Sequence, residues 1–163
     1  MVSEVQEFAD RFDEIRRQAK DAIQNLDERG LNSTPLDQDT SSPAVLVNHM
    51  AAVERFWLCQ IIGGVDIGRP RPDEFMAKAE TVGDLEQLMD EAGRTTREVL
   101  SDMTTEQLHE TRDARGEPRS VQWCLLLAID HLSGHVGHLQ LTRQMYDRTV
   151  TGPQPERAQR QWQ

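Results

Sequence analysis

The chain has 163 residues, which suits a single domain whose core is large enough to be stable without disulfides. Its formal net charge is −10, and basic residues cluster only briefly, at 69–71 and 157–160, so neither nucleic acid nor an anionic membrane is an expected partner. The two cysteines lie in apolar stretches, and no signal peptide or membrane span is evident, so we expect a cytoplasmic protein.

Two long helices are predicted in the first part of the chain. Residues 4–26 form the first, because apolar residues repeat at spacings of three and four and Ser3 with Gln6 suggests a capping box. Residues 43–62 form the second, which a serine and a proline start and two glycines end. His49 lies in the apolar stripe of this second helix, where a leucine would be expected.

Two more helices are predicted in the second part. Thr81, followed by Asp84, starts the third, and its apolar residues again recur at helical spacing. Residues 120–147 form the fourth, which is almost entirely apolar in its first turns and should therefore lie deep in the protein.

The segments between these helices are expected to be irregular. Residues 31–42, 65–80 and 113–118 are rich in Gly, Pro and polar side chains. Connections of about fifteen residues are longer than usual in a helical bundle, so at least one is expected to cross over. The predicted fold is an all-α four-helix bundle with long connections over residues 1–147, followed by a polar tail at 148–163.

Histidines provide the main functional signal. His131, His135 and His138 follow one another at spacings of four and three, which places them on the same side of the fourth helix. Side chains four residues apart can share one cation, and His49 is the natural third ligand from another helix. Three imidazoles suit zinc, nickel, copper or iron and leave coordination positions open. The alternative is a set of unrelated histidines, but a buried imidazole without a partner is costly, which favours a metal site between helices.

Two segments resemble a known family. Residues 48–57, NHMAAVERFW, resemble the His-Leu-x-x-Val-Glu-x-x-Trp segment of the DinB-like superfamily. Residues 130–143, DHLSGHVGHLQLTR, resemble its closing helix, often written His-x-x-x-His-x-Gly-Gln or Glu-x-x-x-His-x-Gly-His. The resemblance implies a four-helix bundle with a non-simple connection and a divalent metal, zinc or nickel in our expectation, held by His49, His131 and His135.

The resemblance also implies an activity. Relatives are metal-dependent S-transferases that join a low-molecular-weight thiol, such as mycothiol or bacillithiol, to a small electrophile. A bound cation lowers the pKa of a coordinated thiol. The branch that isomerises maleylpyruvate has Glu at the position of His131, a departure that argues against that reaction here. His138 is expected beside the metal as a cofactor-binding residue, with an exposed or structural role as the alternative. Arg143 could bind a carboxylate of the thiol or substrate, or could be a solvated charge near the helix end.

Other functions stay open at this point. The protein could be a non-catalytic metal-binding, stress-associated module that forms a homodimer through Phe56, Trp57 and the first helix, or it could be a metal-dependent hydrolase. No Gly-x-Ser-x-Gly motif and no useful Cys–His spacing is present, so the catalytic residue is unknown. Cys124 is expected to be buried and could line the pocket. Glu54 follows His49 by five residues, about 140° around the helix, and is therefore assigned a structural or interface role, with hydrogen bonding to a metal ligand as the alternative.

Overall fold

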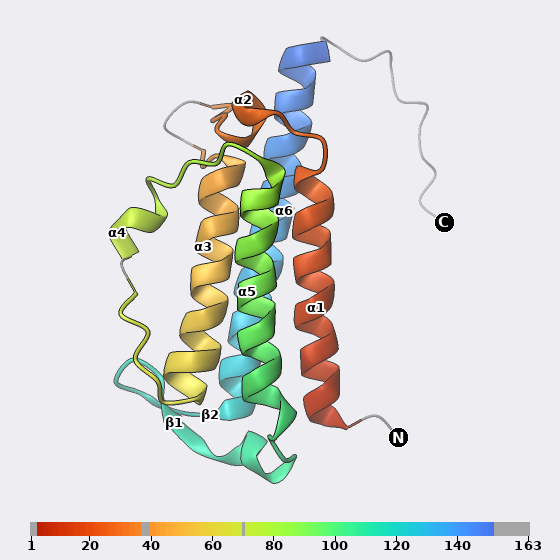
Figure 1. The fold of residues 1–163 in the computed structure, drawn as a ribbon. Helices are drawn as coiled ribbons and strands as arrows, with labels where there is room; N and C mark the ends of the chain where they lie inside the picture. The colour runs from red at the N-terminus through yellow and green to blue at the C-terminus, as the bar shows by residue number, and fades with distance from the viewer. Residues whose placement is uncertain (1–2, 37–39, 70, 152–163) are drawn as a thin grey trace.

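The computed structural model describes residues 3–36, 40–69 and 71–151. Its four long helices lie side by side (Figure 1): α1 (Glu4–Ile23), α3 (Pro43–Arg55), α5 (Val82–Ser101) and α6 (Val121–Thr151). Shorter elements join them: α2 (Glu28–Leu31), the π-helical segment η2 (Phe56–Ile62), α4 (Arg71–Glu74), the 3₁₀ helix η3 (Glu106–His109) and the antiparallel strands β1 (Thr111–Asp113) and β2 (Pro118–Ser120). The predicted all-α class and the helical bundle are confirmed.

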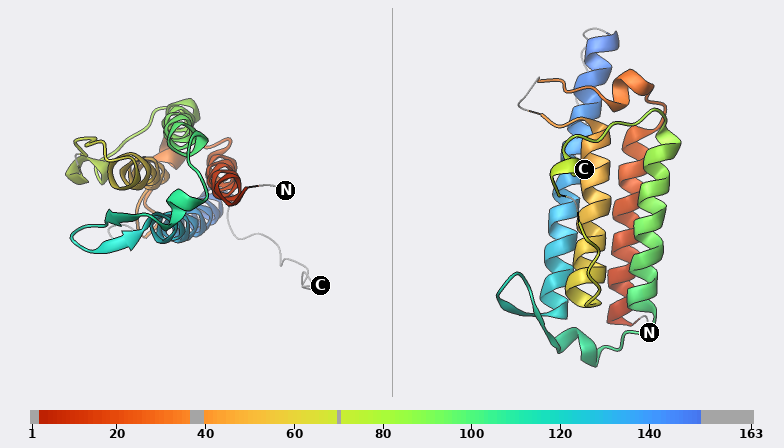
Figure 2. Two further views of the ribbon diagram at one scale, coloured as in Figure 1. Left: turned by 90° about the horizontal axis from the view of Figure 1, so that it is seen from below. Right: turned by 60° about the vertical axis from the view of Figure 1, so that its left-hand side comes forward.

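The order of the helices around the bundle differs from their order in the sequence. Helix α1 packs against α5 and α6, and α3 packs against the same two helices from the other side (Figure 2). Helices α3 and α5 are neighbours that run in the same direction, opposite to α1 and α6 (Figure 1). The segment between α3 and α5, which contains α4, must therefore return along the length of the bundle. This is the predicted crossover connection.

Side-chain caps start the helices where the sequence predicts. Ser3, Ser42 and Thr81 each accept a hydrogen bond from the backbone N–H three residues later. The carboxylate of Asp84 also accepts from the backbone N–H of Thr81, which completes the predicted capping box. The side chain of Gln6 bonds elsewhere on α1, so the box predicted with Ser3 is only half formed.

Two predicted helix ends need correction. Helix α1 ends at Ile23, before residue 26, because Asn25 adopts a left-handed conformation with φ 61° and Asp27 then caps α2. Helix α6 continues past residue 147 to Thr151, and the rest of the predicted tail, 152–163, lies outside the described residues.

Two other segments differ in kind from the prediction. The predicted second helix is α-helical only to Arg55 and then continues as the π-helix η2. The spacing of apolar residues does not distinguish a short π-helix from an α-helix. Residues 113–118, predicted as a polar loop, belong to the hairpin of β1 and β2. Its turn places Arg115 at φ 63° and Gly116 at φ 90°.

The core fills the space between the four long helices. Its fully buried side chains come from all of them and from η2: Phe12, Ile15, Ile23, Met50, Leu58, Met89, Leu125, Leu132 and Leu139. Trp57 is also core, with 4% of its surface exposed. Cys59 and Cys124 are free and buried, as expected. Within the described part of the chain, no helix is both long and apolar enough to cross a membrane.

A buried polar network ties three helices together. Glu54 of α3 is 1% exposed and accepts hydrogen bonds from the guanidinium of Arg16 on α1 and the hydroxyl of Thr96 on α5. Gly93 makes room for this network, because a Cβ there would lie 2.7 Å from Nε of Arg16. The structural role predicted for Glu54 is therefore confirmed.

Candidate metal centre

Three imidazoles converge between α3 and α6. His49 comes from α3, while His131 and His135 are one turn apart on α6, and one nitrogen of each lies within 4.8 Å of the other two. The Nε2 atom of His131 lies 3.4 Å from Nε2 of His49 and 3.1 Å from Nε2 of His135. Ligand nitrogens of a tetrahedral zinc site are about 3.3 Å apart, as metal–nitrogen distances of about 2.0–2.1 Å require. The predicted ligands are therefore brought together in an arrangement that fits a divalent cation.

Glu74 orients the first of these ligands. Its Oε2 accepts a hydrogen bond of 2.9 Å from Nδ1 of His49, so the lone pair of that imidazole is on Nε2, toward the other two histidines. Arg69 donates to both carboxylate oxygens of Glu74. Burial by itself would raise the pKa of Glu74. The hydrogen bonds from Arg69 and His49 outweigh burial and lower this pKa, so the carboxylate stays ionised.

Sequence analysis did not identify Glu74 or Arg69 as site residues. Glu74 follows His49 by 25 residues and lies in a four-residue helix within the crossover connection. No helical periodicity links the two, because their contact depends on how this connection lies over the bundle.

Replacing Glu74 with glutamine is expected to weaken metal binding about 10- to 100-fold, the usual effect of losing a carboxylate that orients a ligating imidazole. The amide keeps the size of the side chain but removes the charge that holds His49 and Arg69. Competition with a chromophoric chelator measures the affinity. Asp73→Asn is the matched control, since this exposed neighbour on α4 also loses one negative charge. Equal affinities in the two variants would contradict a role for Glu74 in orienting His49.

The imidazoles of His131 and His135 are neutral at ordinary pH. Burial and the nearby His131, His49 and His138 lower the pKa of His135 from 6.5 to about 4. Burial and His49, followed by Arg115 and Arg69, also lower the pKa of His131. Their lone pairs are therefore free to bind a cation without first losing a proton.

The metal-free protein is expected to lose stability as the pH falls from 6.5 toward about 4. The folded-state pKa of His135 is depressed, so over this interval the unfolded chain binds a proton that the folded chain does not. Urea denaturation at several pH values measures this slope. The His135→Asn variant should lose less stability than the natural protein over the same pH interval. If the free energy of unfolding falls equally steeply with pH in both proteins, the pKa of His135 is not depressed.

The other predicted site residues lie in different surroundings. His138 is exposed, with its ring centroid 5.6 Å from that of His135. Arg143 donates to Asp147 and to the backbone carbonyl of Gln24, at the end of α1, and is about 12 Å along α6 from His135. The structure does not bring Arg143 to the histidines, and its role in cofactor binding stays a prediction.

Cys124 faces the core and is fully buried. Burial raises the pKa of its thiol and that of Cys59, so both stay protonated. Neither cysteine belongs to the histidine cluster.

The histidine cluster is open to solvent. His49 is buried, His135 is half-buried and His131 is exposed, so a ligand can approach from the side of His131. Phe75 is 53% exposed, and its ring centroid lies 5.5 Å from that of His49. An apolar group therefore borders the opening.

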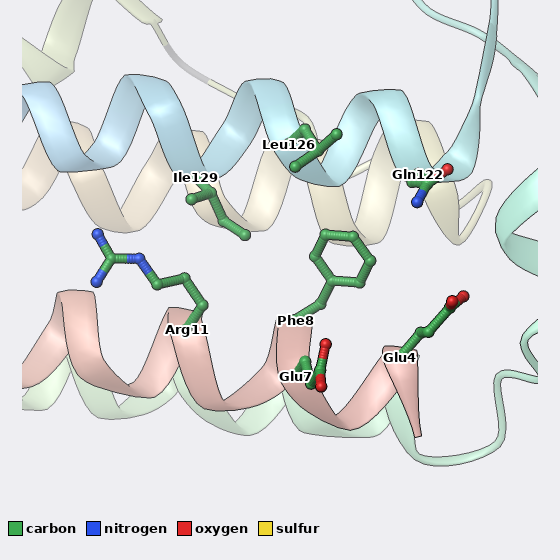
Figure 3. A pocket seen from close by; sticks show the side chains of 7 residues that line it. All are labelled: Glu4, Glu7, Phe8, Arg11, Gln122, Leu126 and Ile129. Atoms are coloured by element: carbon green, nitrogen blue, oxygen red, sulfur yellow. The ribbon is translucent and has the colours of Figure 1, made fainter. Parts of the chain in front are cut away.

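A separate groove lies on another face of α6. It has a volume of about 310 Å³ and runs between the first turns of α1 and α6 (Figure 3). Phe8, Leu126 and Ile129 form its apolar walls, and charged or polar side chains lie at its rim: Glu4, Glu7, Arg11 and Gln122. Leu126 and Ile129 lie on the side of α6 opposite to His131 and His135, so the groove is not part of the metal centre.

Comparisons with known proteins identify the family and support the fold. The family model described as mycothiol-S-transferase matches residues 7–148. No curated protein matches the chain. A solved structure, the "conserved protein of locus from Enterococcus faecalis", shares the fold with a TM-score of 0.75 and 17% sequence identity, over 89% of this chain and 98% of that one. The DinB-like resemblance is thereby confirmed, and the chain belongs to the mycothiol-S-transferase family.

Proposed function

We propose that this protein joins a low-molecular-weight thiol, mycothiol in the first place, to a small electrophile at a metal ion held by His49, His131 and His135. The observation that carries the proposal is the convergence of three imidazoles, with one nitrogen of each within 4.8 Å of the others, in a chain of the mycothiol-S-transferase family. The donor set suits zinc or nickel, and we expect the protein to act in the cytoplasm, where small thiols are reduced.

The chemistry needs a sulfur nucleophile that the chain does not supply. Both cysteines are buried and protonated, so the attacking sulfur must come from a bound thiol. A divalent cation at the histidines would lower the pKa of such a thiol, so that the thiolate is available at neutral pH. The open side at His131 lets the thiol and the electrophile approach together.

Each residue of the centre has a defined task in this proposal. His131 and His135 offer lone pairs because their lowered pKa values keep them neutral. Glu74 holds His49 in the tautomer whose Nε2 faces the site. His138 is assigned contact with the thiol or the electrophile, which its exposed position beside His135 supports.

Thiol-dependent turnover of a generic electrophile, 1-chloro-2,4-dinitrobenzene, tests the function. The metal-loaded protein is assayed with mycothiol, with bacillithiol and without thiol, and product formation is followed by absorbance. We expect a rate that requires a thiol and is lost in His49→Ala, but retained in His109→Ala, which alters an exposed histidine of η3. A protein that keeps its metal and shows no rate with either thiol would overturn the proposal and favour a metal-binding module.

A further inference from the structure

A basic pocket adjoins the metal centre. It has a volume of about 370 Å³ and is lined by side chains from η2, the crossover connection and the hairpin: Phe56, Gln60, Asp66, Arg69, Arg71 and Arg115. Three arginines and one aspartate face this space, in a protein whose net charge is −10. The hairpin and the connection that leads to α4 lie on the same side of the bundle (Figure 1).

Two guanidinium groups lie close to one aromatic ring in this pocket. The Cζ atom of Arg69 lies 5.4 Å from the ring centroid of Phe56, and that of Arg115 lies 5.1 Å from the same centroid. Arg115 also lies 5.3 Å from the ring of Trp57. These contacts fix both cations against a rigid apolar wall, although Arg69 and Arg115 are far apart in the sequence.

The positive charge of the pocket is only partly compensated. Arg69 is paired with Glu74, and the carboxylate of Asp66 accepts a hydrogen bond from the backbone of Gly68. Neither Arg71 nor Arg115 forms an ion pair with a carboxylate of the described residues. Two guanidinium groups that lack a carboxylate partner within the described part of the chain, in a concave site, form a ready receptor for an oxyanion.

The pocket and the metal centre share a wall. Arg69 lines the pocket and donates to Glu74, and the same carboxylate accepts from His49. A molecule bound at the arginines is therefore close to the histidine cluster. Mycothiol, the thiol proposed above in the first place, has no ionised group apart from its thiol, so with this thiol the anion that these arginines fit belongs to the electrophile.

We infer that Arg115 and Arg71, with Arg69, bind a carboxylate of the electrophilic substrate and thereby select anionic electrophiles. The assignment of the anion to the electrophile rests on the proposed function. The presence of an anion site does not depend on that function. Phe56 and Phe75 add apolar surface on the two sides of the site, which suits a carboxylate attached to an aromatic or other apolar group.

A matched pair of electrophiles tests the selection. In 4-(bromomethyl)benzoate and 4-(bromomethyl)benzamide the thiol sulfur displaces bromide from the same benzylic carbon. A carbon–sulfur bond forms, bromide leaves with its electron pair, and the thiol proton passes to solvent. We expect a higher kcat/KM for the benzoate, and a loss of about tenfold or more for that substrate alone in Arg115→Gln, as the loss of a charge-assisted hydrogen bond implies. Arg119→Gln, in the same hairpin but outside the pocket, is the control of equal charge.

Binding measured without turnover separates the two proposals. Isothermal titration of the full-length protein with benzoate should show binding that Arg115→Gln loses and Arg119→Gln keeps. If benzoate binds in this way but no thiol-dependent product forms, the proposed function fails and the anion site stands. If product forms at equal rates from both electrophiles and Arg115→Gln behaves like Arg119→Gln, the anion site is overturned and the proposed function stands. Binding of phenyl phosphate but not benzoate would overturn the assignment to a carboxylate.

Discussion

Replacing His135 with alanine is expected to abolish metal binding. Only two imidazoles, His49 and His131, then face the site, and the nitrogen that lies 3.1 Å from His131 is gone. Metal content per chain, measured by mass spectrometry after dialysis against a mild chelator, should fall from near-stoichiometric to background. Because thiol activation depends on the cation, any thiol-dependent activity should disappear with it.

His138→Ala is the matched control for this experiment. His138 lies one turn further along α6, and its ring centroid is 5.6 Å from that of His135, but it does not belong to the cluster of three nitrogens. The His138→Ala variant should therefore keep its metal. If the metal content per chain is unchanged in His135→Ala, or falls equally in the two variants, the ion is held elsewhere or by different residues.

Changing Glu54 to alanine is expected to lower the free energy of unfolding by about 3–5 kcal/mol, because the buried Arg16 guanidinium loses its buried carboxylate partner and keeps only the partly exposed Asp13. The side chains of Arg16 and Glu54 are 6% and 2% exposed, so solvent cannot replace the lost interaction. The hydroxyl of Thr96 loses its acceptor as well. Urea denaturation of the metal-free protein measures the change without a contribution from the ion.

Glu14→Ala is the appropriate comparison, since Glu14 pairs with Arg17 on the exposed face of α1. Solvent screens that pair, and its loss is expected to change stability little. Similar losses in Glu54→Ala and Glu14→Ala would contradict the view that the buried network fixes α1, α3 and α5 together. The network also matters for the site, because Glu54 lies on the same helix as His49 and so helps to hold that helix in place.

The amino-acid sequence by itself determined where the helices start and which histidines share a helix face. Ser42 and Thr81 act through hydrogen bonds to a backbone N–H three residues away, and His131 and His135 lie together because of the helical repeat. These are short-range effects, so they can be recognised without knowledge of the fold. His49 could be added as a ligand because an imidazole in an apolar stripe needs a partner.

The tertiary structure alone decided which segments meet. The crossover connection brings Glu74 to His49, and the hairpin turn brings Arg115 to Phe56 beside Arg69. The sequence shows the basic cluster at 69–71 but not which residues it meets. Only the fold shows that Arg143, for which the sequence suggests either carboxylate binding or a solvated charge, donates a hydrogen bond to the backbone at the end of α1. Contacts between residues far apart in the chain depend on how whole elements pack, and no local spacing encodes that packing.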